Sequence, residues 1–265
     1  MKMTRLLKRL FAVTAFAALA FMGDAGAAEK SQSPHMSPTM SSTMSPGERK
    51  AIEDIVRDYI LKNPEVVIQS IQTMQAREKQ AAEKKAKASL VKFRPDLLND
   101  PASPVGANLK GDVTIVEFFD YRCGYCKKVF PDVMKVLNDD KYVRYVFKEF
   151  PILGPDSITA SKAALAAWNT DKGKYQAFHQ AMMTAKGGVP ESRVMRIAAK
   201  VGYDVKALKK AMSDPRIEAQ IEKNYAIAQA LNINGTPAFI IGDEIIRGAV
   251  DIGTLKQLVA KARGS

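Results

Sequence analysis

The chain has 265 residues, of which 46% are hydrophobic, 26% charged and 8% aromatic. These values are typical of a folded protein of one or two domains and exclude a disordered or fibrous chain. Lys and Arg outnumber Asp and Glu by 40 to 28, so the net charge of +12 favours anionic partners without identifying one. The two cysteines, Cys123 and Cys126, lie in one Cys-Gly-Tyr-Cys motif. A single pair excludes a scaffold of several disulfides and a four-cysteine zinc site.

The N-terminus shows the features of a secretory signal peptide in the expected order. A basic segment and a short uncharged run, residues 1–22, precede small residues in an A-x-A pattern at 24–28. The uncharged run is short for a membrane span, so an uncleaved anchor is the less favoured alternative. We predict cleavage after Ala27 or Ala28, with residues 1–27 removed. Export makes nucleic acid an unexpected partner.

Residues 28–46 are predicted to be a flexible tether, because they are rich in Ser, Thr and Pro and poor in groups that could form a core. Met36, Met40 and Met44 recur there at a spacing of four. Thioether ligands suit Cu(I), which makes these residues weak candidates for copper binding. A tether that merely contains methionine is the favoured interpretation, and no other metal site is predicted.

Residues 47–92 are predicted to form a helical arm. Residues 45–48 (Ser-Pro-Gly-Glu) have the pattern of a capping box, and an apolar stripe follows over 52–60. Residues 63–65 (Asn-Pro-Glu) indicate a second helix, whose charged stretch 77–92 is predicted to be solvated. Such helices form no core alone, so they pack on the body or on copies of themselves. The flanking tether and polar helix favour the second option, an oligomerisation stalk.

The body, residues 97–265, is predicted to be an α/β domain, because strand-like and helix-like segments alternate. A helical insertion interrupts it. The predicted strands are 113–119, 142–150, 238–241 and 244–247, the predicted helices are 123–137 and 252–259, and the insertion covers about 156–231.

The Cys-Gly-Tyr-Cys motif is placed at a strand-to-helix turn, where free N–H groups and the helix dipole favour a thiolate. Cys123 is therefore the predicted nucleophile, and Cys126, one turn inside, is the resolving thiol. Arg122, Lys127 and Lys128 add positive charge nearby.

Two other interpretations of the motif remain open. The pair could form an inert disulfide, or it could be half of a metal site. The second is disfavoured because His35 and His179 are the only histidines in the chain.

Several stretches resemble a known family. EFFDYRCGYCKK (117–128), NGTPAFIIGDEIIRG (234–248) and the helical insertion between them resemble the thioredoxin-fold, DsbA-like thiol-disulfide oxidoreductases of the bacterial periplasm. The arm, residues 48–77, further resembles the suppressor-of-copper-sensitivity protein C branch. The resemblance covers nearly the whole mature chain. It implies a thioredoxin fold with an inserted all-helical subdomain, preceded by an N-terminal helical oligomerisation arm, in a periplasmic protein without a cofactor.

The resemblance also implies a substrate-binding surface. The family's cis-proline corresponds to Pro237, and Thr236 before it presents backbone that can pair with a substrate strand. Gly124 and Tyr125, between the cysteines, are expected on the same surface.

Glu117, on the strand before the motif, corresponds to the family's buried acid, which is expected to accept the proton of the resolving cysteine. An ordinary glutamate on an edge strand is the competing interpretation. Either Arg144 or Lys148 is expected as the cationic partner of Glu117, depending on strand register.

The Gly-Tyr dipeptide differs from the Pro-His pair of the family's strong oxidase and resembles that of the dimeric bacterial disulfide isomerase. We therefore expect a less oxidising disulfide. The leading hypothesis is a periplasmic isomerase or reductase that acts on misfolded or reduced exported proteins. It is homo-oligomeric, with a trimer favoured by the resemblance, and has a membrane thiol-disulfide redox partner. The alternatives are a monomeric dithiol oxidase whose arm packs on its own body, and a copper-tolerance protein that binds Cu(I) without turnover.

Overall fold

The structure is a computed structural model that describes residues 44–264. The predicted signal peptide and most of the predicted tether, with Met36 and Met40, lie outside the described residues. The chain divides into two compact units, one ending at Asn63 and one beginning at Pro64, and each is described by itself. Within the described range, no helix has the length and apolar character needed to cross a membrane.

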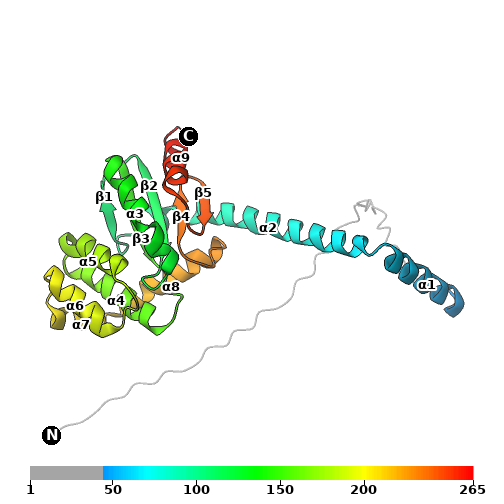
Figure 1. The fold of residues 1–265 in the computed structure, drawn as a ribbon, viewed down its shortest axis with the longest axis horizontal. Helices are drawn as coiled ribbons and strands as arrows, with labels where there is room; N and C mark the ends of the chain where they lie inside the picture. Colours follow the sequence, from blue (N-terminus) through cyan, green and yellow to red (C-terminus); the bar gives the residue numbers. More distant parts are fainter. Residues whose placement is uncertain (1–43, 265) are drawn as a thin grey trace, which may run out of the picture. The chain divides into compact units, whose positions relative to one another are not determined.

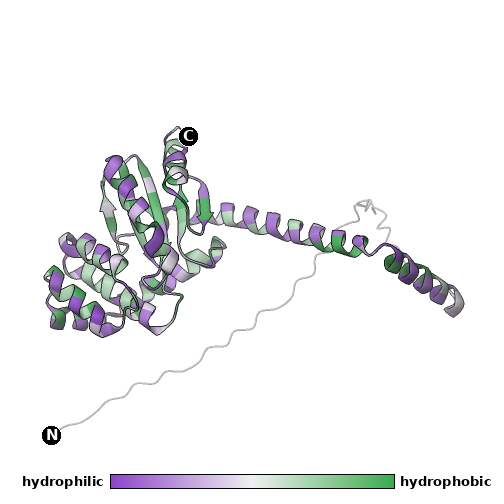
Figure 2. Cartoon of the chain, in the orientation of Figure 1, coloured by the Kyte–Doolittle hydropathy of each residue, from purple (hydrophilic) through white to green (hydrophobic). Residues whose placement is uncertain are grey.

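The first unit contains helix α1 (Pro46–Lys62). Its start follows the predicted capping box, because the Ser45 side chain accepts from the N–H of Glu48 and the Glu48 side chain accepts from the N–H of Ser45. None of its residues is buried. Its apolar residues are therefore exposed, with Ile52 and Val56 each 50% accessible. Figure 2 shows hydrophobic and hydrophilic residues interspersed along this helix.

The second unit begins with helix α2 (Glu65–Leu98), which runs without a break into the body (Figure 1). Its N-cap is Pro64, one residue later than Asn63, the cap that the Asn-Pro-Glu pattern predicts. Ala86, Leu90 and Leu97 are buried, and Leu90 and Leu97 pack with residues of the sheet. The charged residues of 77–92 are exposed as predicted, but the prediction of a solvated stretch is wrong for Ala86 and Leu90. The burial was not predicted because the segment is charged and helix-favouring, and only one face of its second half is apolar.

A five-stranded sheet forms the centre of the body, in the order β1-β3-β2-β4-β5. Strands β2 and β3 are parallel, and the other neighbours are antiparallel. The four predicted strands are present, whereas β1 was not predicted. The bounds are β1 (Val105–Ala107), β2 (Val113–Phe119), β3 (Val143–Glu149), β4 (Ala238–Ile241) and β5 (Glu244–Arg247).

Helices cover both faces of this sheet. On one face, α3 (Gly124–Asp139) and α9 (Ile252–Arg263) pack on β2, and their apolar residues join the larger core. On the other face, α2 and α8 (Pro215–Ala230) form a smaller core with β2, β3 and β4. The predicted helical insertion is confirmed between β3 and β4 (Figure 1). Besides α8, it contains α4 (Pro155–Thr170), α5 (Lys172–Thr184), α6 (Glu191–Val201) and α7 (Val205–Ala211).

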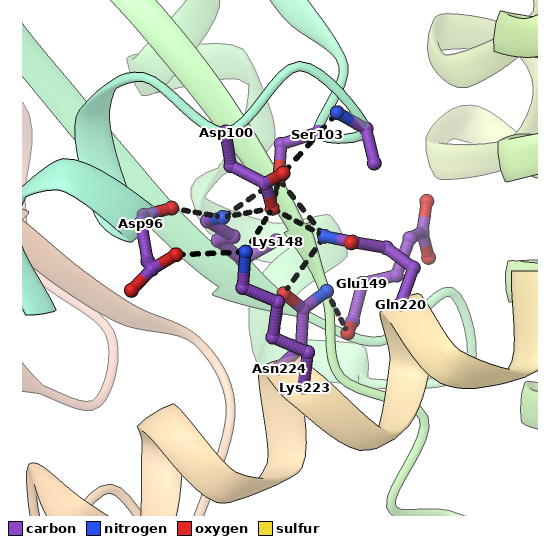
Figure 3. A network of polar contacts seen from close by, with 9 residues as sticks. Asp96, Asp100, Ser103, Lys148, Glu149, Gln220, Lys223 and Asn224 are labelled. Atoms are coloured by element: carbon purple, nitrogen blue, oxygen red, sulfur yellow. Dashed lines mark hydrogen bonds and ion pairs between the residues drawn. The ribbon is translucent and has the colours of Figure 1, made fainter. Parts of the chain in front are cut away.

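A buried polar network fixes the end of α2 to the body (Figure 3). The Lys148 ammonium, fully buried on β3, donates to Asp96 O at 2.7 Å and to Ser103 Oγ at 2.6 Å. It also pairs with Asp100 at 3.3 Å, and Gln220 of α8 donates to the same carboxylate at 2.7 Å. Burial lowers the pKa of Lys148 to about 8. A buried charge needs such partners, so the network specifies where α2 meets the sheet.

Candidate active site

The two cysteines lie where β2 ends and α3 begins, as the sequence predicted. Cys123 is the N-cap of α3, and its sulfur accepts a hydrogen bond from the N–H of Cys126 at 3.2 Å. Gly124 and Tyr125 form the exposed surface of this turn, with Tyr125 66% accessible. The helix start therefore directs backbone N–H groups toward the first sulfur.

The two thiols differ in their electrostatic environment. The pKa of Cys123 is lowered to about 6, first by the hydrogen bond with the Cys126 thiol, and then by Thr236 and by the backbone of the turn, against the opposing effect of burial. Cys126 is fully buried, and burial raises its pKa. At neutral pH the first sulfur is therefore a thiolate and the second a thiol, which is the division of roles expected for a nucleophile and a resolving cysteine.

Two of the three nearby cations bind backbone carbonyl groups. The Arg122 guanidinium donates to the backbone carbonyl of Leu153. Lys127 donates to Met182 O at 3.2 Å and to Ala185 O at 2.6 Å, across the end of α5. These two side chains bind the surrounding loops, and hydrogen bonds are the main cause of the low pKa of Cys123.

Thr236 and Pro237 lie directly against Cys123, although they are more than a hundred residues away in the sequence. In its protonated form, the Cys123 thiol donates to the carbonyl oxygen of Thr236 at 3.2 Å. The Thr236–Pro237 bond is cis, as the resemblance implied. Strand β4 begins at Ala238 and pairs with β2, which brings this loop to the same end of the sheet as the cysteines.

Glu117 is buried within the central strand β2, 2% exposed, so the alternative of an edge glutamate is wrong. Its carboxylate accepts a hydrogen bond from the Tyr145 hydroxyl. Burial raises its pKa to about 8. It also lies close enough to Cys126 to help raise the pKa of that thiol.

The expected cationic partner of Glu117 is absent. Glu117 is paired with Phe147 in the β2–β3 register, so Arg144 and Lys148 project from the opposite face of the sheet. The partner is the neutral hydroxyl of Tyr145, which lies on the same face as Glu117. A strand predicted without its register could not distinguish these possibilities.

Two residues beside the motif escaped the sequence analysis. Asp120 is fully buried, and its carboxylate accepts three hydrogen bonds. An aspartate two residues before an N–H that it binds is a common turn pattern, so a local signal existed. Tyr121 is also fully buried, and its hydroxyl lies 3.0 Å from Nδ1 of His179. Burial lowers the pKa of His179 to about 3, so this imidazole is neutral.

Among residues 44–264, no three or more His, Cys, Asp or Glu side chains are grouped to hold a metal ion. Met44, the one described member of the methionine set, is half exposed.

The comparisons with known proteins agree with this geometry. The model of the DSBA-like thioredoxin domain matches residues 114–260, more than half of the chain, and spans the cysteines, the helical insertion and Pro237. The chain belongs to the DSBA-like thioredoxin family. A second model, the N-terminal domain of the copper resistance protein ScsC, matches residues 48–81. The chain is therefore of the ScsC branch, as the sequence predicted.

Solved structures show the same fold. A thioredoxin-like oxidoreductase from Silicibacter pomeroyi DSS-3 is 44% identical, with 65% of this chain and 98% of that chain covered and a TM-score of 0.63. A linker-deletion mutant of Proteus mirabilis ScsC is 27% identical, with 84% and 98% covered and a TM-score of 0.65.

Curated relatives include the Disulfide bond formation protein D of Bacillus subtilis, 27% identical over 60% of this chain and 76% of that protein. The chain also matches sodium/proton antiporters of the NhaA type, such as that of Salinispora arenicola, but spans only 26% of its length. The Bacillus subtilis protein, covered to 76%, and a Rickettsia conorii relative named as a protein-disulfide oxidoreductase, covered to 61%, have names that refer to disulfide chemistry.

Proposed function

We propose that this protein is a periplasmic thiol-disulfide oxidoreductase that acts as a disulfide isomerase or reductase on exported proteins. The observation that carries the proposal is the asymmetry of the two thiols. A sulfur with a pKa of about 6, at a helix N-terminus, lies above a buried thiol whose pKa is raised. Cysteines with a purely structural role need no difference in pKa. Thiol-disulfide exchange, in contrast, requires one thiolate that attacks the substrate and a second thiol that stays protonated until it resolves the mixed disulfide.

In the first step, the Cys123 thiolate attacks one sulfur of a substrate disulfide. A bond forms between Cys123 and that sulfur, the substrate S–S bond breaks, and the other substrate sulfur leaves as a thiolate that takes a proton from solvent. Backbone of Thr236, which contacts Cys123, is placed to pair with an extended substrate segment. Gly124 and Tyr125 present an open, partly apolar surface to that segment.

The mixed disulfide has two fates. In isomerisation, another substrate thiolate attacks the substrate sulfur, releases the Cys123 thiolate and forms a new substrate disulfide, with no net transfer of electrons. In reduction, Cys126 attacks the Cys123 sulfur and forms the Cys123–Cys126 disulfide. The substrate sulfur leaves as a thiolate and is protonated, so the substrate has gained two electrons and has two thiols. Cys126 must lose its proton first, and the ionised form of Glu117, which is the minor form below its raised pKa of about 8, is the buried base beside it.

The arm supports isomerisation over simple dithiol chemistry. An isolated helix the length of α1 is only marginally stable in water, and its apolar residues are exposed. A bundle of such helices from several copies would bury them and place several Cys123 sites around one client. The match of residues 48–81 to the ScsC N-terminal model supports a homo-oligomer of this kind, with a trimer preferred.

The proposed location follows from the predicted signal peptide, cleaved after Ala27 or Ala28, and from the periplasmic setting of DsbA-like proteins. An isomerase needs Cys123 and Cys126 reduced, so the proposal includes a membrane thiol-disulfide partner that supplies electrons to the pair. Its clients are misfolded or wrongly bonded exported proteins.

The first experiment tests the roles of the two cysteines. Alkylation of the reduced protein by iodoacetamide should label Cys123, with a half-maximal rate near pH 6. Cys126→Ser should accumulate a mixed disulfide with a scrambled client, and Cys123→Ser should form none. Equal labelling of both cysteines up to pH 9 would reject the proposal.

A second experiment tests the arm with two matched variants. The seam variant, Val56→Gln with Ile60→Gln, removes two apolar side chains from one face of α1. The control variant, Asp54→Gln with Asp58→Gln, makes the same number of changes two positions away, on the opposite face. Light scattering should show that the seam variant alone loses its oligomeric mass.

One observation favours the oxidase alternative. A low pKa of Cys123 stabilises the reduced dithiol, which makes the disulfide more oxidising. If the wild-type protein is a monomer and oxidises reduced dithiols without unscrambling a client, the oxidase is the correct function.

Copper binding is tested separately, because the ScsC model carries the name of a copper resistance protein. Replacement of Met36, Met40 and Met44 together should lower the Cu(I) stoichiometry if the tether binds copper. An unchanged stoichiometry would remove the tether from any copper-binding role.

A further inference from the structure

Asp120 lies in the turn between the end of β2 and Cys123, and it is fully buried. Its carboxylate accepts from the N–H of Arg122 at 2.7 Å and from the Ser157 hydroxyl at 2.8 Å, both at Oδ1, and from the N–H of Leu153 at 3.1 Å at Oδ2. The three donors belong to the catalytic turn, the start of α4 and the loop between β3 and α4. One side chain therefore joins the catalytic turn to the β3–α4 loop and the start of α4, which lie more than thirty residues later in the sequence.

The backbone of Asp120 contacts both cysteines. Its carbonyl oxygen accepts from the N–H of Cys123 at 3.0 Å. Its backbone also interacts with the Cys126 thiol and opposes the rise in the pKa of that group. Asp120 thus binds Cys123 through its main chain and the β3–α4 loop through its side chain.

The contact with the β3–α4 loop is reciprocal. The N–H of Leu153 is bound by Asp120, and its carbonyl oxygen is bound by the Arg122 guanidinium. Gly154, the next residue, has a φ of +102°, and a Cβ there would lie 3.3 Å from Arg122 Nη1. A glycine at this position lets the loop approach the catalytic turn. The Leu153 side chain remains 42% exposed beside it.

The hydrogen bonds that stabilise the Cys123 thiolate depend on the geometry of this turn. The N–H of Cys126 reaches the Cys123 sulfur only if Cys123 keeps its N-cap conformation. Asp120 is the buried residue that fixes the chain immediately before that cap. Buried hydrogen-bond networks of this kind are costly to leave half satisfied, so removal of an acceptor should disturb the turn.

We propose that Asp120 is a positioning residue: it holds Cys123 in the conformation that stabilises the thiolate, and it ties that conformation to the loop that carries Leu153. The inference rests on the proposed function in one respect, namely that Cys123 is the reacting thiol. No substrate atom needs to touch Asp120.

The test compares Asp120→Asn and Ser157→Ala with wild type in the reduced, full-length mature protein. Asparagine keeps the size of the side chain but offers one acceptor oxygen instead of two. Ser157→Ala keeps the carboxylate and removes one of its donors. Asp100→Asn is the matched control, because Asp100 is also a buried, hydrogen-bonded carboxylate but lies in the network around Lys148.

The readout is the pKa of Cys123, from thiolate absorbance at 240 nm and from alkylation rates. Asp120→Asn should raise it by about half a unit or more, which is about a threefold loss of thiolate at pH values below the pKa. Ser157→Ala should shift it less, in the same direction. Asp100→Asn should lower the melting temperature and leave the pKa of Cys123 unchanged.

The sign of the shift decides between positioning and a simple charge effect. Removing a negative charge near a thiol lowers its pKa, so a fall in Asp120→Asn would show that Asp120 acts only as a charge and would overturn the inference. An unchanged pKa in both site variants would overturn it as well. If Asp120→Asn fails to fold, Ser157→Ala decides alone. Mass mapping of the alkylated cysteine in wild type tests the proposed function independently of these shifts.

Discussion

Glu117 gives the most quantitative prediction, because its carboxyl group is fully buried and its pKa is raised from 4.5 to about 8. The perturbation is Glu117→Gln, which keeps an acceptor for the Tyr145 hydroxyl but cannot ionise. Below pH 4.5 the carboxyl is protonated in both the folded and the unfolded chain. Between pH 4.5 and about 8 the unfolded chain releases this proton and the folded chain retains it.

The stability that wild type derives from protonated Glu117 is therefore fully present below pH 4.5 and is lost as the pH rises toward 8. The full difference of about 3.5 units corresponds to about 5 kcal/mol at 1.4 kcal/mol per unit, as an upper bound. Wild type loses this stability as the pH rises, whereas Glu117→Gln does not. We therefore expect the free energy of unfolding of Glu117→Gln, relative to that of wild type, to increase by about 2–5 kcal/mol from pH 4.5 to 8.

The assay is urea unfolding of the reduced proteins at a series of pH values, followed by the fluorescence of Trp168, the only tryptophan and a buried one. Cys123 titrates in both proteins, so its contribution cancels in the difference except for its electrostatic coupling with Glu117. Glu222→Gln, which changes an exposed glutamate, is the control and should differ from wild type by a constant amount. A constant difference for Glu117→Gln over the same range would refute the assignment of Glu117 as a buried base with a raised pKa.

Three further predictions concern the arm and the thiols. The seam variant should be monomeric in light scattering and the control variant should keep the wild-type mass; equal masses would exclude α1 from the oligomer interface. Leu90→Ala should destabilise the body by about 2–5 kcal/mol, because Leu90 is buried, whereas Met74→Ala in the exposed half of the same helix should change the urea midpoint little. Equal effects would mean that α2 does not pack on the sheet as described. The alkylation rate of reduced wild type should fall steeply only below pH 6, and a midpoint near 9 would show that Cys123 has an ordinary pKa.

Much of the fold could be predicted because local patterns and long-range packing agree. The central strand β2 is a nearly continuous apolar run, and the capping box fixes the start of α1. Strand β1 could not be predicted, because it has three residues and contains Gly106, whose missing side chain leaves room for Phe147. Its pairing with β3 stabilises it only in the folded body.

In the site, too, features set by local sequence were predictable and features set by long-range packing were not. The placement of Cys123 and Cys126 was predictable from the strand, the motif and the helix after it. The neutral partner of Glu117 was not, because it depends on the β2–β3 register. Asp120 was overlooked, because two of its three hydrogen-bond donors come from segments more than thirty residues away, although its bond to the N–H of Arg122 is local.

The central claim is that Cys123 reshuffles disulfides in clients that an oligomeric arm holds near several active sites. It is tested most directly by reactivation of a scrambled multi-disulfide substrate with the wild-type, seam and control proteins, alongside a simple disulfide reduction assay. Point variants are preferred to deletion of the arm, because α2 continues into the core at Ala86. We expect wild type and the control variant to restore the substrate, and the monomeric seam variant to lose reactivation while it still reduces disulfides. A wild-type protein that cannot restore the substrate, or a monomeric seam variant that restores it equally well, would contradict the account.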